Sequence, residues 1–220
     1  MSTINPRRYA IKEAFFTLQG EGGQVGRAAV FCRFTGCNLW SGRTQDRATA
    51  PCNFCDTDFV GTDGPGGGRF DAHALAEHLW SIWQSEAGPG GTPYIVFTGG
   101  EPTLQLDEAL IDCCKARGFE LAIETNGTRE VPEGIDWVCV SPKPGPALVQ
   151  LQGQALKLVY PQPEAALQPE MFVDLEFEHF FLQPMDGPQQ AENIQAATRY
   201  CLKHPQWRLS LQTHKIIGLP

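Results

Sequence analysis

The feature that most constrains the fold is an alternation of short apolar runs with helical patterns along a chain of 220 residues. Runs of strand length occupy residues 29–34, 93–97, 119–123, 137–140, 155–160, 179–182 and 207–211. Apolar residues recur at helical spacing in residues 71–82, 104–117 and 189–203. Strands that are apolar throughout are typical of parallel sheets with both faces covered. The pattern therefore predicts an α/β fold, as an open parallel sheet or a partial (β/α) barrel.

Helix boundaries can be placed from single residues in two of these segments. Asp71 can cap a helix on which Leu75, Leu79 and Ile82 share one face. Gly118 can end the helix predicted over residues 104–117, because glycine adopts the left-handed conformation common at helix ends.

Charge and hydropathy exclude several classes of partner. The 25 acidic and 17 basic side chains give a net charge of −8, so no broad basic surface is available for nucleic acid or an anionic membrane. Residues 1–8 contain two arginines without an apolar core segment, and no run approaches the roughly 20 apolar residues of a membrane span. We expect a single domain over residues 1–220 in a soluble, cytoplasmic protein.

Polar residues gather directly after five of the predicted strands. Parallel strands place their carboxyl ends on one edge of a sheet or barrel, where binding sites form. Five polar segments should therefore converge on one site: residues 98–101 (TGGE), 124–127 (ETNG), 141–143 (SPK), 183–186 (QPMD) and 212–214 (QTH).

Three of the eight cysteines are candidates for metal ligands. Cys32, Cys113, Cys114, Cys139 and Cys201 fall in predicted strands or helices, where a free cysteine packs as a small apolar residue. The loop residues Cys37, Cys52 and Cys55 have the spacing C-x14-C-x2-C. Three thiolates on a [4Fe-4S] cluster leave one iron open to chelation by an amino acid. The alternative is a structural zinc site, which usually needs a fourth Cys or His ligand.

Together these motifs resemble the radical S-adenosylmethionine superfamily and, within it, the 7-carboxy-7-deazaguanine synthase family of the queuosine pathway. The matching segments are residues 16–22 (FTLQGEG), 31–34 (FCRF), 52–57 (CNFCDT), 98–102 (TGGEP), 124–127, 141–143 and 183–185, together with Cys37. The superfamily usually spaces its cysteines C-x3-C-x2-C, whereas the first gap here has 14 residues. The aromatic Phe54 before the last cysteine does match.

The resemblance implies a partial (β/α) barrel with a reduced set of helices and a specific reaction. The substrate would be 6-carboxy-5,6,7,8-tetrahydropterin, and the product 7-carboxy-7-deazaguanine, formed with loss of ammonia. A reduced cluster would cleave S-adenosylmethionine, the resulting radical would take hydrogen from C6, and the cofactor would be reformed after ring contraction. The resemblance further implies Mg²⁺, a homodimer, and an electron donor such as flavodoxin.

The same resemblance assigns residues to the cluster and to S-adenosylmethionine. Cys37, Cys52 and Cys55 would hold the cluster. Backbone at the two glycines before Glu101 would approach the methionine part of the cofactor, because small residues allow close approach. The full set of cofactor contacts is Phe54, Cys55, Asp56, Gly100, Glu101, Ser141, Pro142, Lys143, Gln183, Pro184, Met185 and Asp186.

A second set of residues would bind the substrate and magnesium. A pterin presents adjacent N–H donors that a carboxylate can accept in pairs, which suits Glu21 or the α-carboxylate of Pro220. Arg33 suits the carboxylate of the substrate, with hydrogen bonds from His214 and Gln19, although it could instead form an internal ion pair. Thr57 would bind Mg²⁺, with Asp56 and Asp58 nearby. The substrate contacts are Leu18, Gln19, Gly20, Glu21, Arg33, Thr98, His214 and Pro220.

Two other functions remain open from the sequence. One is an activase that makes a glycyl radical on a partner protein; residues 16–22 and Pro220 favour a small enclosed ligand instead. The other is a zinc-stabilised binding module without catalysis. Measuring the iron and zinc content of the purified protein distinguishes this module from a cluster enzyme.

Overall fold

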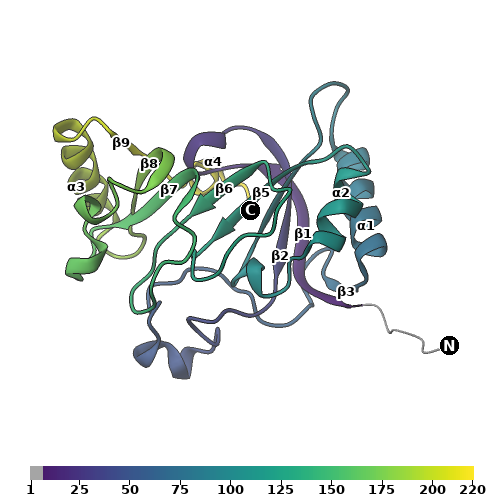
Figure 1. Ribbon diagram of the computed structural model, residues 1–220, viewed down its shortest axis with the longest axis horizontal. Helices are drawn as coiled ribbons and strands as arrows, with labels where there is room; N and C mark the ends of the chain where they lie inside the picture. The colour runs from purple at the N-terminus through teal and green to yellow at the C-terminus, as the bar shows by residue number, and fades with distance from the viewer. Residues whose placement is uncertain (1–6) are drawn as a thin grey trace.

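The computed structural model describes residues 7–220, which form a mixed α/β fold around a nine-stranded sheet (Figure 1). The strand order is β3-β1-β2-β4-β5-β6-β7-β8-β9. The strands are β1 (Tyr9–Leu18), β2 (Ala28–Phe34), β3 (Gly68–Phe70), β4 (Tyr94–Gly99), β5 (Glu120–Thr125), β6 (Trp137–Val140), β7 (Gln152–Tyr160), β8 (Glu176–Pro184) and β9 (Trp207–Leu209).

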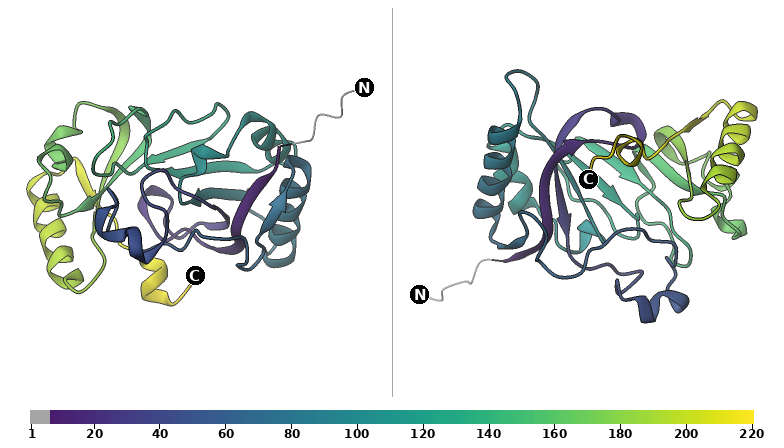
Figure 2. Two further views of the ribbon diagram at one scale, coloured as in Figure 1. Left: turned by 90° about the horizontal axis from the view of Figure 1, so that it is seen from below. Right: turned by 180° about the vertical axis from the view of Figure 1, so that it is seen from behind.

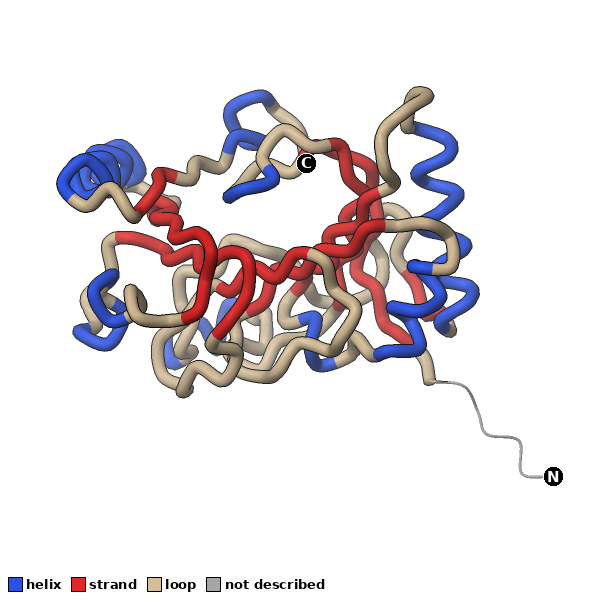
Figure 3. Tube along the Cα trace, turned by 45° about the horizontal axis from the view of Figure 1, so that its top comes forward, coloured by secondary structure: helices blue, strands red, loops and turns tan. Residues whose placement is uncertain are grey.

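Most of the sheet is parallel, as the apolar runs predict. Strands β2 and β4 through β9 run in one direction, whereas β1 pairs antiparallel with β2 and β3 pairs antiparallel with β1. The strands curve around a central region, and the C-terminal end of the chain lies over it (Figure 3). The carboxyl ends of the parallel strands therefore meet on one side of the molecule.

Helices cover the sheet at both ends. Helices α1 (Ala72–Glu86) and α2 (Glu108–Lys115) pack together near β1 and β2, while α3 (Gln190–Lys203) packs against β8 and β9 at the opposite end (Figure 2). The short helix α4 (Thr213–Ile217) and the 3-10 turns η1 (Gly22–Gln24), η2 (Thr44–Thr49), η3 (Pro102–Leu104), η4 (Ala165–Leu167) and η5 (Pro169–Met171) complete the fold. No helix within residues 7–220 is long and apolar enough to cross a bilayer.

Two apolar cores lie beneath these helices. Under α1 and α2, buried residues of β2, β4 and β5 pack with Leu75, Leu79 and Leu110. Under α3, buried residues of β6, β7 and β8 pack with Ala197 and Trp207. Packing at both ends leaves the middle of the sheet to support the site.

The structure confirms the predicted start of one helix and contradicts the predicted start of another. The Asp71 side chain accepts a hydrogen bond from the Ala74 amide at 2.9 Å and caps α1, as predicted. The helix predicted over residues 104–117 is wrong at its start. Asp107 accepts from the Leu110 amide at 3.2 Å, so α2 begins at Glu108 after a separate 3-10 turn. Gly118, at φ 82°, ends this helical segment as predicted.

Strands β1 and β3 and helix α4 lie outside the predicted elements. Strand β1 pairs antiparallel with β2, and its register shifts between Ile11 and Glu13, which interrupts the alternation of apolar and polar residues. Helix α4 has only five residues and none of them is buried, so apolar periodicity could not reveal it.

Candidate active site

A cavity of about 420 Å³ opens at the carboxyl ends of the parallel strands. All five polar segments predicted for this edge contribute residues to its lining. From these segments come Thr98, Gly99, Gly100, Glu124, Thr125, Asn126, Ser141, Lys143, Gln183, Pro184, Met185, Asp186, Gln212 and His214. The loop after β2 adds Cys52, Phe54, Cys55, Asp56, Thr57 and Asp58, so two of the three candidate metal ligands share one cavity with the polar segments. The third, Cys37, does not line this cavity.

The three loop cysteines lie close together beside this cavity. The interaction between the Cys52 and Cys55 side chains lowers the pKa of Cys55 to about 6 and raises the pKa of Cys52. Burial raises the pKa of Cys37, and the charge of Cys55 adds to this effect, so Cys37 lies within electrostatic range of the pair. Lys143 faces both Cys52 and Cys55 and favours their thiolate forms.

This donor set consists of three cysteine thiols, which suits a [4Fe-4S] cluster that keeps one iron open. The metal centres of a [4Fe-4S] cluster sit at separate corners, so its cysteine ligands are spread around the cluster. A zinc ion instead draws four ligands to about 2.0–2.3 Å from one centre.

The 14-residue gap between the first two cysteines folds back onto the cysteine loop. It contains the 3-10 turn Thr44–Thr49, and the Arg47 guanidinium lies over the Trp40 ring at 4.0 Å from its centroid. Arg47 donates hydrogen bonds to the carbonyls of Asn53 at 2.9 Å and Cys55 at 2.8 Å. The longer gap thus supplies a clamp for the cysteine loop.

Glu101 and Pro142 are the two predicted cofactor contacts that do not line the cavity of the described chain. The fully buried Glu101 carboxylate accepts hydrogen bonds from the Thr125 hydroxyl at 2.7 Å and from the backbone amide of Asn126 at 2.8 Å. It also accepts from the amide and hydroxyl of Thr103 at 3.1 and 2.7 Å. In this structure Glu101 joins the loops after β4 and β5.

Gly100 lets the loop after β4 approach the first cysteine. A Cβ at this position would lie 2.1 Å from the Gly36 carbonyl oxygen and 3.0 Å from the Cys37 Cβ. The Glu101 amide donates to the same carbonyl at 2.8 Å. Close packing of these two loops holds the Cys37 backbone at the edge of the site.

All eight predicted substrate contacts line the cavity: Leu18, Gln19, Gly20, Glu21, Arg33, Thr98, His214 and Pro220. Two ends of the sequence meet here. The amide and hydroxyl of Thr213 both donate to the Gly20 carbonyl at 2.9 Å, and the Gly22 amide donates to Ser210 Oγ at 2.9 Å. The Thr17 hydroxyl donates to Pro220 O at 3.3 Å.

Arg33 and His214 keep polar atoms at the cavity wall. Arg33 Nε donates to Glu13 Oε1 at 2.7 Å, which realises the internal ion pair left open by the sequence. Both residues of this pair nevertheless line the cavity. Burial lowers the pKa of His214, partly offset by the nearby Glu21 charge, so its imidazole is neutral at pH 7.

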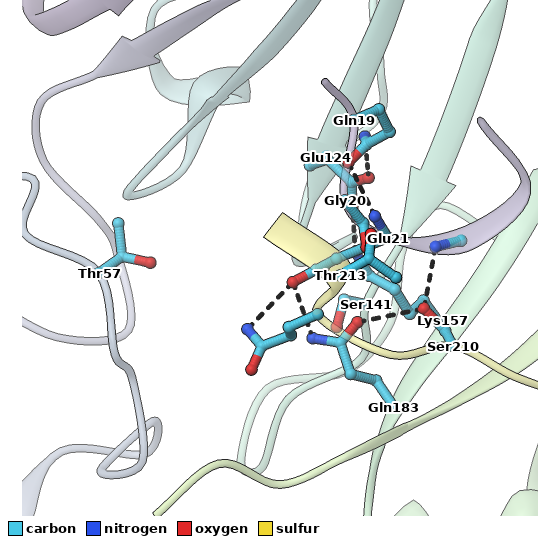
Figure 4. Close-up of polar contacts among 12 residues, drawn as sticks. Gln19, Gly20, Glu21, Thr57, Glu124, Ser141, Lys157, Gln183, Ser210 and Thr213 are labelled. Atoms are coloured by element: carbon cyan, nitrogen blue, oxygen red, sulfur yellow. Dashed lines mark hydrogen bonds and ion pairs between the residues drawn. The ribbon is translucent and has the colours of Figure 1, made fainter. Parts of the chain in front are cut away.

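Lys157 on β7 lies at the centre of a buried network that sequence reasoning missed (Figure 4). Its side chain is only 6 % exposed, and its ammonium lies 2.5 Å from Glu21 Oε2 and 2.9 Å from Glu124 Oε2. Glu21 Oε1 accepts from the amides of Gln183 and Gln212, each at 3.1 Å. The only sequence signal was one lysine within an otherwise apolar strand.

The charges in this network stabilise one another. Burial alone would lower the pKa of Lys157, but the carboxylates of Glu124 and Glu21 raise it well above its usual value. Burial alone would raise the pKa of Glu21, but the Lys157 ammonium keeps it below its usual value. Both groups are therefore ionised at neutral pH, with Lys157 buried and Glu21 partly buried.

A second lysine joins helix α4 to the cysteine loop. Lys215 Nζ lies 2.6 Å from both Asp56 Oδ2 and Asp186 Oδ2. Thr57, beside Asp56, lies apart from the Glu21 network across the site (Figure 4). The Lys215 contacts thus join helix α4 both to the cysteine loop and to the end of β8.

On the cofactor side, Lys143 Nζ donates to Ser141 Oγ at 2.5 Å.

Comparison with known proteins places these features in one family, although no family model matches the chain. The chain is 62 % identical to a 7-carboxy-7-deazaguanine synthase from Bordetella pertussis, over 96 % of this chain and 99 % of that protein. It is 55 % identical to the protein of the same name from Burkholderia multivorans, with the same coverage. It also resembles QueE from Escherichia coli, with a TM-score of 0.68, 25 % identity and 93 % of each chain covered. The chain therefore belongs to the 7-carboxy-7-deazaguanine synthase family.

Proposed function

We propose that the protein is a radical S-adenosylmethionine lyase that converts 6-carboxy-5,6,7,8-tetrahydropterin into 7-carboxy-7-deazaguanine and ammonia. The observation that carries this proposal is a single cavity, lined by the cysteine loop on one side and by the Glu21 network on the other. The parallel run of β2 and β4 through β9, and the curvature of the sheet, support a partial (β/α) barrel formed as one domain over residues 1–220.

The thiols of Cys37, Cys52 and Cys55 would hold a [4Fe-4S] cluster with one iron free for S-adenosylmethionine. When bound, the cluster and this cofactor supply the one-electron chemistry that starts the reaction. The chain would hold the cofactor with backbone and polar groups around the cysteine loop and the ends of β4, β6 and β8. These contacts are Phe54, Cys55, Asp56, Gly100, Ser141, Pro142, Lys143, Gln183, Pro184, Met185 and Asp186, with Glu101 holding the loop that carries Gly100.

The opposite wall would bind the pterin. Glu21, fixed by two amides and one ammonium, would accept the adjacent N–H donors of the ring. Arg33 bonds Glu13 through Nε, and its terminal nitrogens make no hydrogen bond within residues 7–220, so they can bind the substrate carboxylate. His214 and Gln19 would add hydrogen bonds, while Leu18, Gly20, Thr98 and Pro220 complete the wall.

Further parts of the proposal rest on the family. Thr57 would bind Mg²⁺ together with substrate oxygens, because magnesium takes few protein ligands. The protein would act as a cytoplasmic homodimer, receive electrons from a donor such as flavodoxin, and serve queuosine biosynthesis and thereby tRNA modification. The cavity, at about 420 Å³, is in the size range of small-molecule sites, which supports a small substrate over the glycyl-radical loop of a partner protein.

Turnover tests this function directly. Anaerobically reconstituted protein is incubated with S-adenosylmethionine, a reductant, Mg²⁺ and the carboxytetrahydropterin, and products are measured by mass spectrometry. We expect 7-carboxy-7-deazaguanine without net loss of S-adenosylmethionine. Cys37→Ala should abolish turnover, whereas Cys201→Ala, on α3 away from the cavity, should retain it. Cofactor cleavage without the deazaguanine product would refute the proposed substrate.

A further inference from the structure

Lys157 is a buried cation to which the family resemblance assigned no role. It projects from β7 into the cavity, where it meets carboxylates from two other parts of the chain. Glu21 follows β1, and Glu124 lies on β5. A buried ammonium that bridges two carboxylates is costly to desolvate, so packing alone does not explain it.

The hydrogen bonds show what the ammonium does to Glu21. Oε1 of Glu21 already accepts from two amides, and Oε2 accepts from Lys157, so the carboxylate is held in one orientation. A carboxylate oxygen can accept two hydrogen bonds, which leaves Oε2 with capacity for a ligand. Glu124 is fixed in the same way, by Lys157 at 2.9 Å and by Gln19 at 3.3 Å.

We propose that Lys157 is a positioning residue that holds Glu21 and Glu124 beside each other and aims Glu21 at a planar heterocycle with adjacent N–H donors. This inference rests on the proposed function and adds a residue that sets substrate specificity. With Lys157, the three groups carry a net charge of −1; without it, two buried carboxylates would carry −2. Like charges in a buried site raise the pKa, so one carboxylate would then take up a proton.

The ionisable groups around Lys157 are few and come from four elements. Glu21 and Glu124 contact it directly, and Cys139 on β6 lies within electrostatic range. His214 on α4 faces Glu21 from the other side. The thiol of Cys139 is buried with its pKa raised well above the usual value. The Lys157 charge also lowers the pKa of His214, so each titration is repeated in a His214→Asn background, where a new titration near neutral pH would come from the two carboxylates.

The test measures ligand binding rather than turnover. Lys157→Met removes the charge and keeps a flexible chain of similar length. Reconstituted protein with S-adenosylmethionine and no reductant is titrated with 6-carboxypterin from pH 6 to 8.5, and binding is followed by pterin fluorescence. The ratio of variant to wild-type dissociation constants cancels the titration of the ligand itself. Lys115→Met, which removes a partly exposed lysine paired with Asp136, is the matched control.

Three results are expected. Lys157→Met should weaken binding at pH 7 by about tenfold or more, since Glu21 loses its orientation and one carboxylate becomes protonated. The ratio should fall as pH rises, because deprotonation restores the acceptor, whereas Lys115→Met should give a ratio near one throughout. The double variant Lys157→Met/Glu124→Gln restores a net charge of −1 and should recover the part of the affinity that protonation removed, with little pH dependence.

Several results would overturn the inference. These are a ratio near one for Lys157→Met, a ratio that does not change with pH, or a double variant that binds no better than the single one. If Lys157→Met alone does not fold, the charge-balanced double variant carries the test, and a loss beyond tenfold there refutes the charge argument. Failure of the wild-type protein to bind 6-carboxypterin refutes the proposed substrate first, and the inference falls with it.

Discussion

Gly20→Ala is the sharpest test of how the C-terminal segment completes the site. An added Cβ would lie 2.1 Å from His214 Nδ1, 2.7 Å from its Cγ and 2.8 Å from its Cβ. The backbone of Gly20 is not in the left-handed region, so backbone strain does not add to the effect of this contact. Because ordinary contact begins at 3.4 Å, the His214 ring must move by more than about 1 Å.

Moving this ring displaces the segment that carries it. The two hydrogen bonds from Thr213 to the Gly20 carbonyl, and the Lys215 contacts with Asp56 and Asp186, are made by the same short helix. Overpacking of this kind costs about 1–3 kcal/mol. If the segment must be docked for binding, that cost weakens substrate affinity roughly 5- to 150-fold.

Two measurements check this reasoning. Fluorescence titration with 6-carboxypterin gives the loss of affinity, and hydrogen exchange reports the protection of the Thr213 amide, which donates to Gly20. Gly88→Ala is the control, because a Cβ there meets nothing within 4 Å. Unchanged affinity together with unchanged exchange in Gly20→Ala would refute the account of the docked segment.

Three further predictions concern the cysteine loop, His214 and a helix cap. Arg47→Met removes two hydrogen bonds to carbonyls of the cysteine loop, so a chelator should extract iron several-fold faster than from Arg43→Met, and equal rates would contradict the clamp. Burial should place the pKa of His214 below 6.5 in an NMR titration assigned with His214→Asn, and a value at or above 6.5 refutes its buried neutral state. Asp71→Ala should lower the free energy of unfolding by about 1 kcal/mol in denaturant titrations, and no change would contradict the cap of α1.

The lowered pKa of His214 also fixes the direction of its effect on stability. The folded state binds a proton on this imidazole less readily than the unfolded state. The contribution of His214 to the free energy of unfolding is therefore fully present above the pKa of the unfolded state, about 6.5. It is lost as the pH falls from that value through the lower pKa of the folded state. As the pH falls from 7 to 5, the free energy of unfolding should therefore decrease more in the wild type than in His214→Asn.

The parallel core and the edge that carries the site followed from the sequence. Apolar runs such as residues 137–140 mark strands wherever both faces are covered, and β6 spans the same residues. The polar segments after those runs could then be assigned to one edge, where the structure brings them together around one cavity. Local pattern and parallel topology were sufficient for this step.

Contacts between distant segments could not be predicted in the same way. Lys157 alternates with the buried Leu156 and Leu158 on β7, but the sequence does not show which face of that strand lines the cavity. The clamp by Arg47 depends on how the long gap folds back, and the docking of α4 depends on tertiary contacts at Gly20. Each of these contacts joins residues whose spacing carries no periodic signal.

The central claim is that three thiolates hold a [4Fe-4S] cluster whose remaining iron binds S-adenosylmethionine. Mössbauer spectroscopy of protein reconstituted with ⁵⁷Fe tests it directly, with and without the cofactor. We predict roughly four irons per chain, one of which changes its spectrum when S-adenosylmethionine is added. A protein that binds zinc instead of iron, or a cluster in which no iron responds to the cofactor, would contradict the account.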